Sequence, residues 1–342
     1  MRRFLLTGSL LAVAAAAFAA NPFYLDHSGA LWNASSTANG LLLTATKDST
    51  EVVHSLVPFP IGIAGSNDSQ IQVAADDLTG KVMVVWQRNW SESASEIMLA
   101  VWRGGTWERI EHLSHDFGAH PRNPTILLSV ASTTVPDPTH PEDPTLATVV
   151  SDSFLHVLWW QGVSGMAQSA QYALLRLTGD PSDPTDLTQT DLDAYAGPTV
   201  ACDAAPAEST LEHPLFASQA APDQAVLLFA SPRNCLTHLL QVSFGLEPTS
   251  GYDPITVVSQ RRRHTPIFGV RKEFPLIQDL SMEGARVILG ANLKPVVYRV
   301  AGGNTLEYVM ATDTGWTSLR TLVASDALTL DQAIPLVENL VR

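Results

Sequence analysis

Charged residues are scarce in this chain, and basic residues are scarcer still. Only 16% of the 342 residues are Asp, Glu, Lys or Arg, and 20 Lys and Arg stand against 34 Asp and Glu, which gives a formal net charge of −14. The phosphates of a nucleic acid would be repelled by such a protein, so this class of partner is set aside. The apolar content of 45% is sufficient for a large core and argues against a disordered chain.

Long apolar runs are also missing, with one exception at the N-terminus. Met1, Arg2 and Arg3 supply a positively charged start, residues 4–16 are apolar, and residues 17–19 read Ala-Phe-Ala. This order is typical of a secretory signal peptide, so we expect residues 1–19 to be removed and residues 20–342 to form one secreted or periplasmic domain. A retained membrane anchor is the alternative, but the run is short for one. After cleavage we expect no membrane span.

Cysteine is nearly absent. The two cysteines, Cys202 and Cys235, are expected to form a disulfide, because a pair in an exported protein usually does so. Two buried free thiols are the alternative.

Short runs rich in Val, Leu, Ile and aromatic residues recur between clusters of turn-forming residues, which predicts an all-β protein. Residues 82–86, 154–160 and 225–229 are continuously apolar, and such strands require burial on both faces. The packed blades of a β-propeller provide that environment.

An internal repeat supports a single propeller. An aromatic residue ends each apolar strand at Trp86, Trp160, Phe229 and Tyr298, at intervals of roughly 70 residues, and Trp32 is a plausible earlier member. We expect about five units of four strands, near residues 30–60, 70–114, 122–200, 213–258 and 265–323, with six or seven blades still open.

Prolines are expected to open the first strand of a unit, at residues 213–216 and 274–277. Residues 334–340 resemble another such strand, so we expect a C-terminal strand that closes the ring. Residues 283–290 offer one further strand.

Two Gly-containing turns resemble eroded Asp-box motifs. They read Gly-Gly-Thr-Trp at residues 104–107 and Asp-Thr-Gly-Trp at residues 313–316. Such turns mark the sialidase-like (BNR/Asp-box type) β-propeller superfamily, where they lie between the third and fourth strands of a blade. Sialidases of that superfamily use an arginine triad, a Tyr–Glu pair and an Asp. No such set can be assigned here, so the resemblance implies the fold rather than the activity.

The expected ligand face follows from the propeller topology. Loops that join strand four to the next strand one, and strand two to strand three, share one end of the sheets. Candidate catalytic carboxylates there are Asp116, Asp326 and Asp68, and candidate ligand-binding residues are Arg88, Trp90, His115, His120, Arg233, Arg261 and Arg263.

Known catalytic motifs are missing. The sequence contains no Gly-x-Ser-x-Gly, His-Glu-x-x-His or phosphate-binding Gly loop, and no cofactor is expected. His112, His115, Asp116 and His120 could together hold a metal ion, but a hydrated polar loop at residues 112–120 is the favoured interpretation. We therefore expect a binding module for a glycan or an extracytoplasmic protein. The alternative is a glycoside hydrolase that uses two facing carboxylates.

Overall fold

A computed structural model describes most of the chain after residue 22. The described residues are 23–57, 67–91, 94–114, 120–137, 143, 145–162, 169–196, 215–246, 263–277, 280, 285–289, 294–328 and 333–339, except 181, 222, 232–233, 334 and 338. The expected signal peptide at residues 1–19 lies outside this set. Within it, no helix has the length and apolar character needed to cross a membrane.

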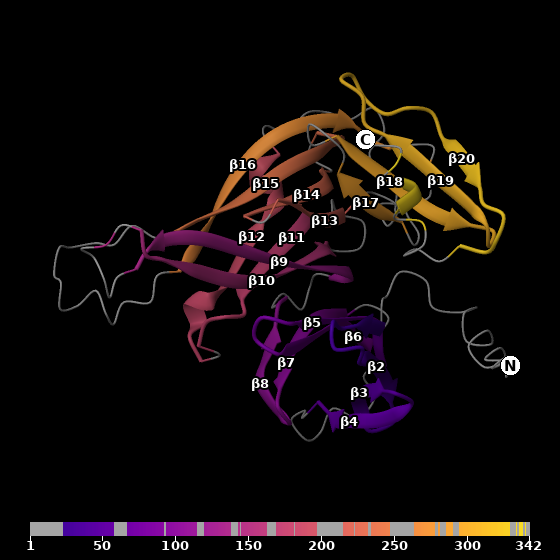
Figure 1. The fold of residues 1–342 in the computed structure, drawn as a ribbon. Helices are drawn as coiled ribbons and strands as arrows, with labels where there is room; N and C mark the ends of the chain where they lie inside the picture. The colour runs from indigo at the N-terminus through magenta and orange to yellow at the C-terminus, as the bar shows by residue number, and fades with distance from the viewer. Residues whose placement is uncertain are drawn as a thin grey trace, which may run out of the picture.

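The described strands form five antiparallel sheets of four strands each, and in every sheet the spatial order of strands follows the chain order (Figure 1). The first two sheets contain β1 (Phe23–Leu25), β2 (Leu31–Thr37), β3 (Gly40–Lys47) and β4 (Thr50–Leu56), then β5 (Asn67–Asp76), β6 (Lys81–Ser91), β7 (Ala94–Arg103) and β8 (Thr106–His112). The third contains β9 (Arg122–Pro136), β10 (Ala147–Gln161), β11 (Ser169–Arg176) and β12 (Leu187–Asp191). The last two contain β13 (Leu215–Ala221), β14 (Gln224–Ser231), β15 (Leu236–Leu246) and β16 (His264–Pro275), then β17 (Arg286–Leu289), β18 (Pro295–Ala301), β19 (Thr305–Met310) and β20 (Arg320–Val323).

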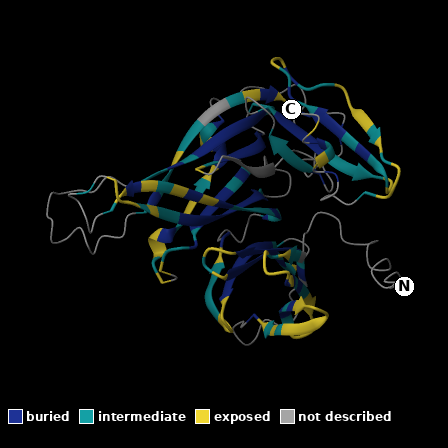
Figure 2. Cartoon of the chain, viewed as in Figure 1, coloured by how far each residue is buried: buried dark blue, intermediate teal, exposed yellow. Residues whose placement is uncertain are grey.

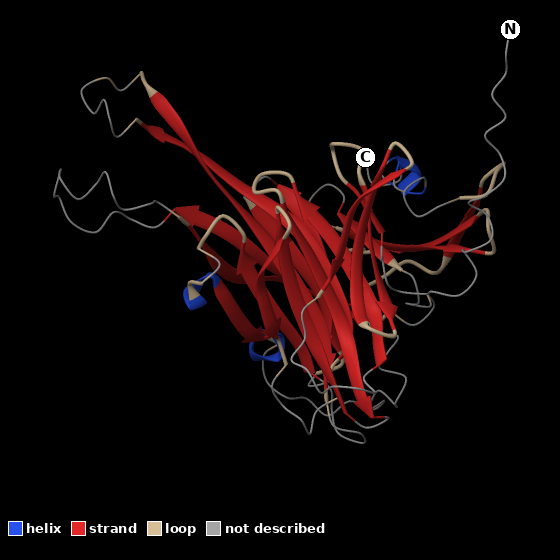
Figure 3. Ribbon diagram, turned by 90° about the horizontal axis from the view of Figure 1, so that it is seen from below, coloured by secondary structure: helices blue, strands red, loops and turns tan. Residues whose placement is uncertain are grey.

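Helical structure is confined to short segments (Figure 3). Two 3-10 helices, η1 (Pro184–Asp186) and η2 (Leu192–Tyr195), flank β12. Near the C-terminus, residues 333, 335–337 and 339 are helical. The prediction of an all-β protein is therefore confirmed.

Apolar side chains fill the space between successive sheets, and the central strands are the most deeply buried (Figure 2). Residues 82–86 of β6 are all buried, with Trp86 fully inaccessible. Their side chains alternate between the cluster shared with the first sheet and the cluster shared with the third. The expectation that continuously apolar strands are covered on both faces is confirmed.

The repeat of aromatic residues marks the second strand of every sheet. Trp32 lies in β2, Trp86 in β6, Trp160 in β10, Phe229 in β14 and Tyr298 in β18. The five units predicted from this repeat correspond to the five sheets. The first strands also pack in sequence, since β5 contacts β9, β9 contacts β13 and β13 contacts β17, while β2 contacts β5.

The boundary between the fourth and fifth units was predicted wrongly. Pro275 does not open a strand: it is the last residue of β16, the fourth strand of the fourth sheet, and pairs with Leu236. The fifth sheet begins instead at β17, within the segment 283–290 that the sequence offered as a further strand. A proline is tolerated at either end of an edge strand, because its missing N–H lies outside the ladder.

The expected C-terminal strand at residues 334–340 is not formed. The described residues of this segment are helical, and Ala333 and Val337, four positions apart, are both buried. They pack with Tyr298 and Tyr308 against a face of the fifth sheet. Side chains four residues apart share one face of a helix, whereas a strand would bury alternate residues. Among the described residues, no contact between the fifth and first sheets is as extensive as those between successive sheets.

Candidate functional site

Three residues of the expected ligand face, Asp68, Arg88 and Trp90, form a closed cluster at one end of the second sheet. Arg88 Nε and Nη2 donate to Asp68 at 2.8 and 3.0 Å, and Trp86 Nε1 donates to the same carboxylate at 3.1 Å. The Arg88 guanidinium also lies 5.7 Å from the ring centres of Trp86 and Trp90. Asp68 and Arg88 are buried, so each charge is neutralised by the other and neither faces a ligand in solvent.

The other described candidates of that face are not gathered around this cluster. Asp326 is exposed and accepts a hydrogen bond from Ser325 Oγ at 3.1 Å. The backbone N–H of His120 donates to Gly162 O at 2.7 Å. His115, Asp116, Arg233 and Arg261 lie outside the described residues, so their proposed roles stay predictions.

Arg263 lies at the opposite end of the sheets from the expected face. It directly precedes β16, which is the fourth strand of its sheet and not the first strand of the next one. Its Nη1 donates to Thr185 Oγ1 at 3.4 Å, a residue of η1 in the connection between β11 and β12. The same shift of one strand that moved Pro275 therefore moved Arg263 to the other end.

Of the two cysteines that were expected to form a disulfide, the structure describes Cys235. Cys235 precedes β15 and has a left-handed backbone with φ of 55°. No cysteine among the described residues is a free thiol. Cys202 lies outside the described residues, and the Cys202–Cys235 pair stays a prediction.

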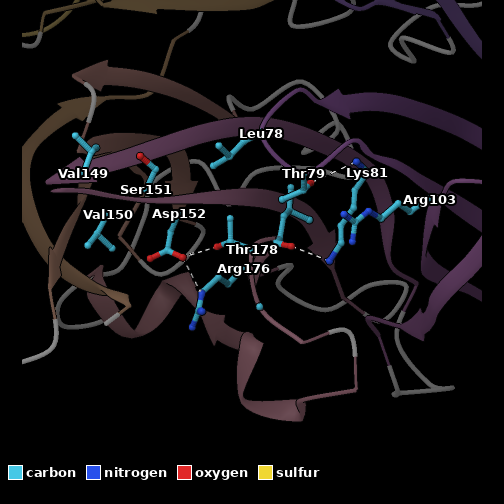
Figure 4. Close-up of a pocket in the computed structure, with 12 residues that line it drawn as sticks. Leu78, Thr79, Lys81, Arg103, Val149, Val150, Ser151, Asp152, Arg176 and Thr178 are labelled. Carbon is cyan, nitrogen blue, oxygen red and sulfur yellow. Dashed lines mark hydrogen bonds and ion pairs between the residues drawn. The ribbon is translucent and has the colours of Figure 1, made fainter. Parts of the chain in front are cut away.

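A pocket of about 550 Å³ opens between the second and third sheets, at the end opposite to the expected face (Figure 4). The turn between β5 and β6, the end of β7, the first half of β10 and the end of β11 form its wall. The lining residues are Leu78, Thr79, Lys81, Arg103, Val149, Val150, Ser151, Asp152, Arg176, Leu177, Thr178 and Gly179. Hydroxyl, cationic and aliphatic groups thus share one space whose size suits a small ligand.

Asp152 is the carboxylate of this pocket, and hydrogen bonds engage both of its oxygens. Oδ1 accepts from Arg176 Nε at 3.1 Å and from the Thr178 hydroxyl, while Oδ2 accepts from the backbone N–H and ring Nδ1 of His264 at 2.8 and 2.9 Å. Burial alone would raise the pKa of Asp152, but these hydrogen bonds and the Arg176 charge outweigh it and lower the pKa. The group is therefore ionised at neutral pH.

Two further polar contacts join the second and third sheets next to the pocket. Lys81 Nζ crosses to the third sheet and donates to Leu177 O at 2.7 Å, and it lies 3.5 Å from Glu108 Oε2. Ser153 Oγ crosses in the other direction and donates to Asp76 Oδ2 at 2.8 Å. These interactions fix the two walls relative to each other, because each buried polar group needs its partner.

Three cationic side chains line the pocket, those of Lys81, Arg103 and Arg176. Among the described residues, Arg103 has the weakest contacts of the three. Its side chain is 55% exposed, and among the described residues it makes one ion pair, at 3.9 Å from Glu108 Oε1. Arg176, by contrast, is held by Asp152 and by Asp186 at 3.4 Å. Arg103 therefore has donors available for an incoming acceptor group.

Sequence reasoning missed this pocket because it rested on the loops of the other end. The signal that could have found it is a pair of polar residues, Asp152 and Ser153, immediately before the apolar run 154–160, because a charge next to such a run needs a partner when it is buried. Within the part of the chain that the structure describes, no group of three or more His, Cys, Asp or Glu side chains is arranged to hold a metal ion.

Comparison with protein-family models and with curated proteins finds no match to this chain.

Proposed function

We propose that this chain is an exported, sialidase-like β-propeller that acts as a binding module for a glycan or an extracytoplasmic protein. The pocket between the second and third sheets is its ligand site. The five successive sheets and the packing of their first strands support the propeller. Class averages from electron microscopy should show a ring of blades, and an open row of sheets would contradict closure.

The two Asp-box-like turns support the resemblance by their position. Trp107 follows the turn between β7 and β8, and its Nε1 donates to Ser55 in β4 at 3.0 Å. Trp316 lies between β19 and β20, and its Nε1 donates to Pro275 O in β16 at 2.8 Å. Each tryptophan thus joins the turn between strands three and four of one sheet to strand four of the preceding sheet.

The hydrogen bonds of Asp152 favour ligand binding over glycoside hydrolysis as the function of the pocket. Hydrolysis of a glycosidic bond needs two carboxyl groups across the substrate, about 5–9.5 Å apart, one of which donates a proton. Asp152 is the one carboxylate among the described lining residues, and its lowered pKa prevents it from donating a proton near neutral pH. The pocket therefore favours binding.

The hydroxyl groups and the exposed side chain of Arg103 favour a glycan as the ligand. Thr79 and Thr178 donate their hydroxyl protons to buried carboxylates, and Thr79 Oγ1 also accepts from the backbone N–H of Lys81 at 3.3 Å. Each hydroxyl oxygen still has a lone pair that can accept from a sugar hydroxyl. Arg103 supplies the complementary donors.

Titration of a glycan panel against the full chain by calorimetry tests this proposal. Arg103→Ala should weaken binding at least tenfold while leaving the melting temperature nearly unchanged, because the side chain is exposed. Arg320→Ala is the matched control, an exposed arginine on β20 far from the pocket residues in the chain. Equal affinity in the Arg103 variant would contradict the site, and release of free sugar from aryl glycosides would favour the hydrolase.

A further inference from the structure

A hydroxyl, an imidazole and a carboxylate stand in series at the junction of the third and fourth sheets. Thr133 Oγ1 of β9 lies 3.0 Å from Nε2 of His264, the first residue of β16. Nδ1 of the same ring lies 2.9 Å from Asp152 Oδ2 of β10. This is the order of groups found in hydrolytic triads, which are recognised by geometry and not by chain position.

The surroundings of Asp152 fix the roles of the two ring nitrogens. An ionised carboxylate only accepts hydrogen bonds, so the Nδ1 of His264 must carry the proton in that contact. In the neutral ring Nε2 is then an acceptor, and the Thr133 hydroxyl donates to it. Arg176, Thr178 and the His264 backbone hold the carboxylate in place. The imidazole is therefore oriented as a general base toward Thr133.

A second histidine of the third sheet shows what this arrangement adds. His156 is fully buried, with Ser129 Oγ at 2.7 Å from Nε2 and Tyr172 OH at 2.9 Å from Nδ1. No carboxylate orients it, and burial lowers its pKa to about 3. Ser129 is buried too, so no substrate reaches it. At His264 the acid and base are buried, but Thr133 is partly exposed.

The hydroxyl also lies close to the pocket. Thr133 pairs directly with Val150 in the β9–β10 ladder, and Val150 and Asp152 both line the pocket. Side chains opposite each other in an antiparallel pair point to the same face of the sheet. The side chains of Thr133, Val150 and Asp152 therefore share the face of the third sheet that packs toward the fourth sheet, and Val150 and Asp152 connect this face to the edge of the pocket.

We propose that Thr133 is the nucleophile of an acyl-transfer site, with His264 as its general base and Asp152 as the positioning residue, and that the protein hydrolyses small carboxylic esters. Thr133 Oγ1 attacks the ester carbonyl, and its proton passes to His264 Nε2. The proton then moves to the departing alkoxide as the bond between carbonyl carbon and leaving oxygen breaks. Water attacks the acylated Thr133 with the same base, which releases the acid and restores the hydroxyl.

This activity goes beyond the proposed glycan binding and is tested separately. The full chain is treated with a fluorophosphonate, which phosphonylates base-activated hydroxyls, and the modified residue is located by peptide mass spectrometry. We expect one adduct per chain, on Thr133, together with hydrolysis of p-nitrophenyl acetate. Absence of an adduct, or an adduct on another residue, would overturn the proposal even if glycans bind.

Variants separate chemistry from structure. Thr133→Val should lower labelling and hydrolysis at least 100-fold, and Thr133→Ser, which keeps a hydroxyl, should restore them. Thr134→Val is the matched control, since Thr134 is exposed next to Thr133 in the same strand. Asp152→Asn should lower the rate and change its pH profile in addition to lowering the stability, whereas a purely structural role would lower the stability and leave the profile unchanged. Unchanged rates in Thr133→Val would refute the assignment.

Discussion

Two buried carboxylates, at opposite ends of neighbouring sheets, are each bonded to an arginine, but they differ in what lies beside them. Asp68 and Arg88 form a bidentate pair enclosed by Trp86 and Trp90. Asp152 shares its oxygens among Arg176, Thr178 and His264, and it borders an open pocket. A buried ion pair therefore does not mark a site by itself. The open volume beside Asp152 and the partly exposed Thr133 hydroxyl connected to it through His264 distinguish the second carboxylate from the first.

The largest effect is expected at the enclosed pair. Arg88→Met should lower the free energy of unfolding by about 3–5 kcal/mol, because it leaves the Asp68 charge buried without its partner. Urea unfolding monitored by tryptophan fluorescence measures the change. The double variant Asp68→Leu/Arg88→Met should recover most of the loss, since both charges are then removed. A loss below 1 kcal/mol in the single variant would mean that Asp68 is not enclosed.

An intermediate effect is expected at the pocket carboxylate. Asp152→Asn should cost about 1.5–3 kcal/mol at pH 7, because it removes charge-assisted hydrogen bonds to Arg176 and His264. The pKa of Asp152 is lower in the folded chain than its ordinary value of 3.8. Its contribution to stability is therefore complete above that value and is lost as the pH falls through the folded pKa.

Unfolding curves at several pH values test the sign of this effect. Below pH 3.8 the wild type should lose stability more steeply than Asp152→Asn, so the two curves should converge in acid. Parallel curves would show that the carboxylate is not preferentially ionised in the folded chain.

The smallest effect is expected at the edge of the pocket. A Cβ on Gly179 would lie 1.7 Å from Asp186 Oδ2, so Gly179→Ala must displace a carboxylate that lies 3.4 Å from Arg176. We expect a loss of roughly 1–2 kcal/mol, seen as a melting temperature a few degrees lower. Gly269→Ala is the matched control, because a Cβ there meets no atom within 4 Å. Equal melting temperatures for the two variants would contradict the close packing of Gly179.

The fold could be predicted where the pattern is local. Residues 82–86 are apolar at every position, and aromatic residues recur once per unit, so the sequence predicted buried second strands and five units. The errors fell on short apolar segments near a proline. Residues 334–340 are equally compatible with a strand or a helix by composition, and the buried pair Ala333 and Val337 identifies the helix only when the packing is seen.

The candidate site could be predicted only in part. Asp68 lies in β5, and Arg88 and Trp90 lie in β6, so all three are strand residues rather than loop residues. Their mutual contacts depend on distances that the spacing of residues in the sequence does not give. The misassigned start of the fifth unit carried Arg263 to the wrong end.

The sequence by itself determined the all-β class, the number of four-stranded units and the burial of the aromatic second strands, because apolar runs and their recurrence are properties of neighbouring residues. Only the tertiary structure decided where chemistry can occur. His264 and Asp152 are 112 residues apart, and Lys81 and Leu177 are 96 apart, so they meet only because three sheets pack side by side. That packing removes water from the charged side chains. A buried charge is tolerated only where a partner lies within hydrogen-bond distance, and the tertiary structure decides which partner that is.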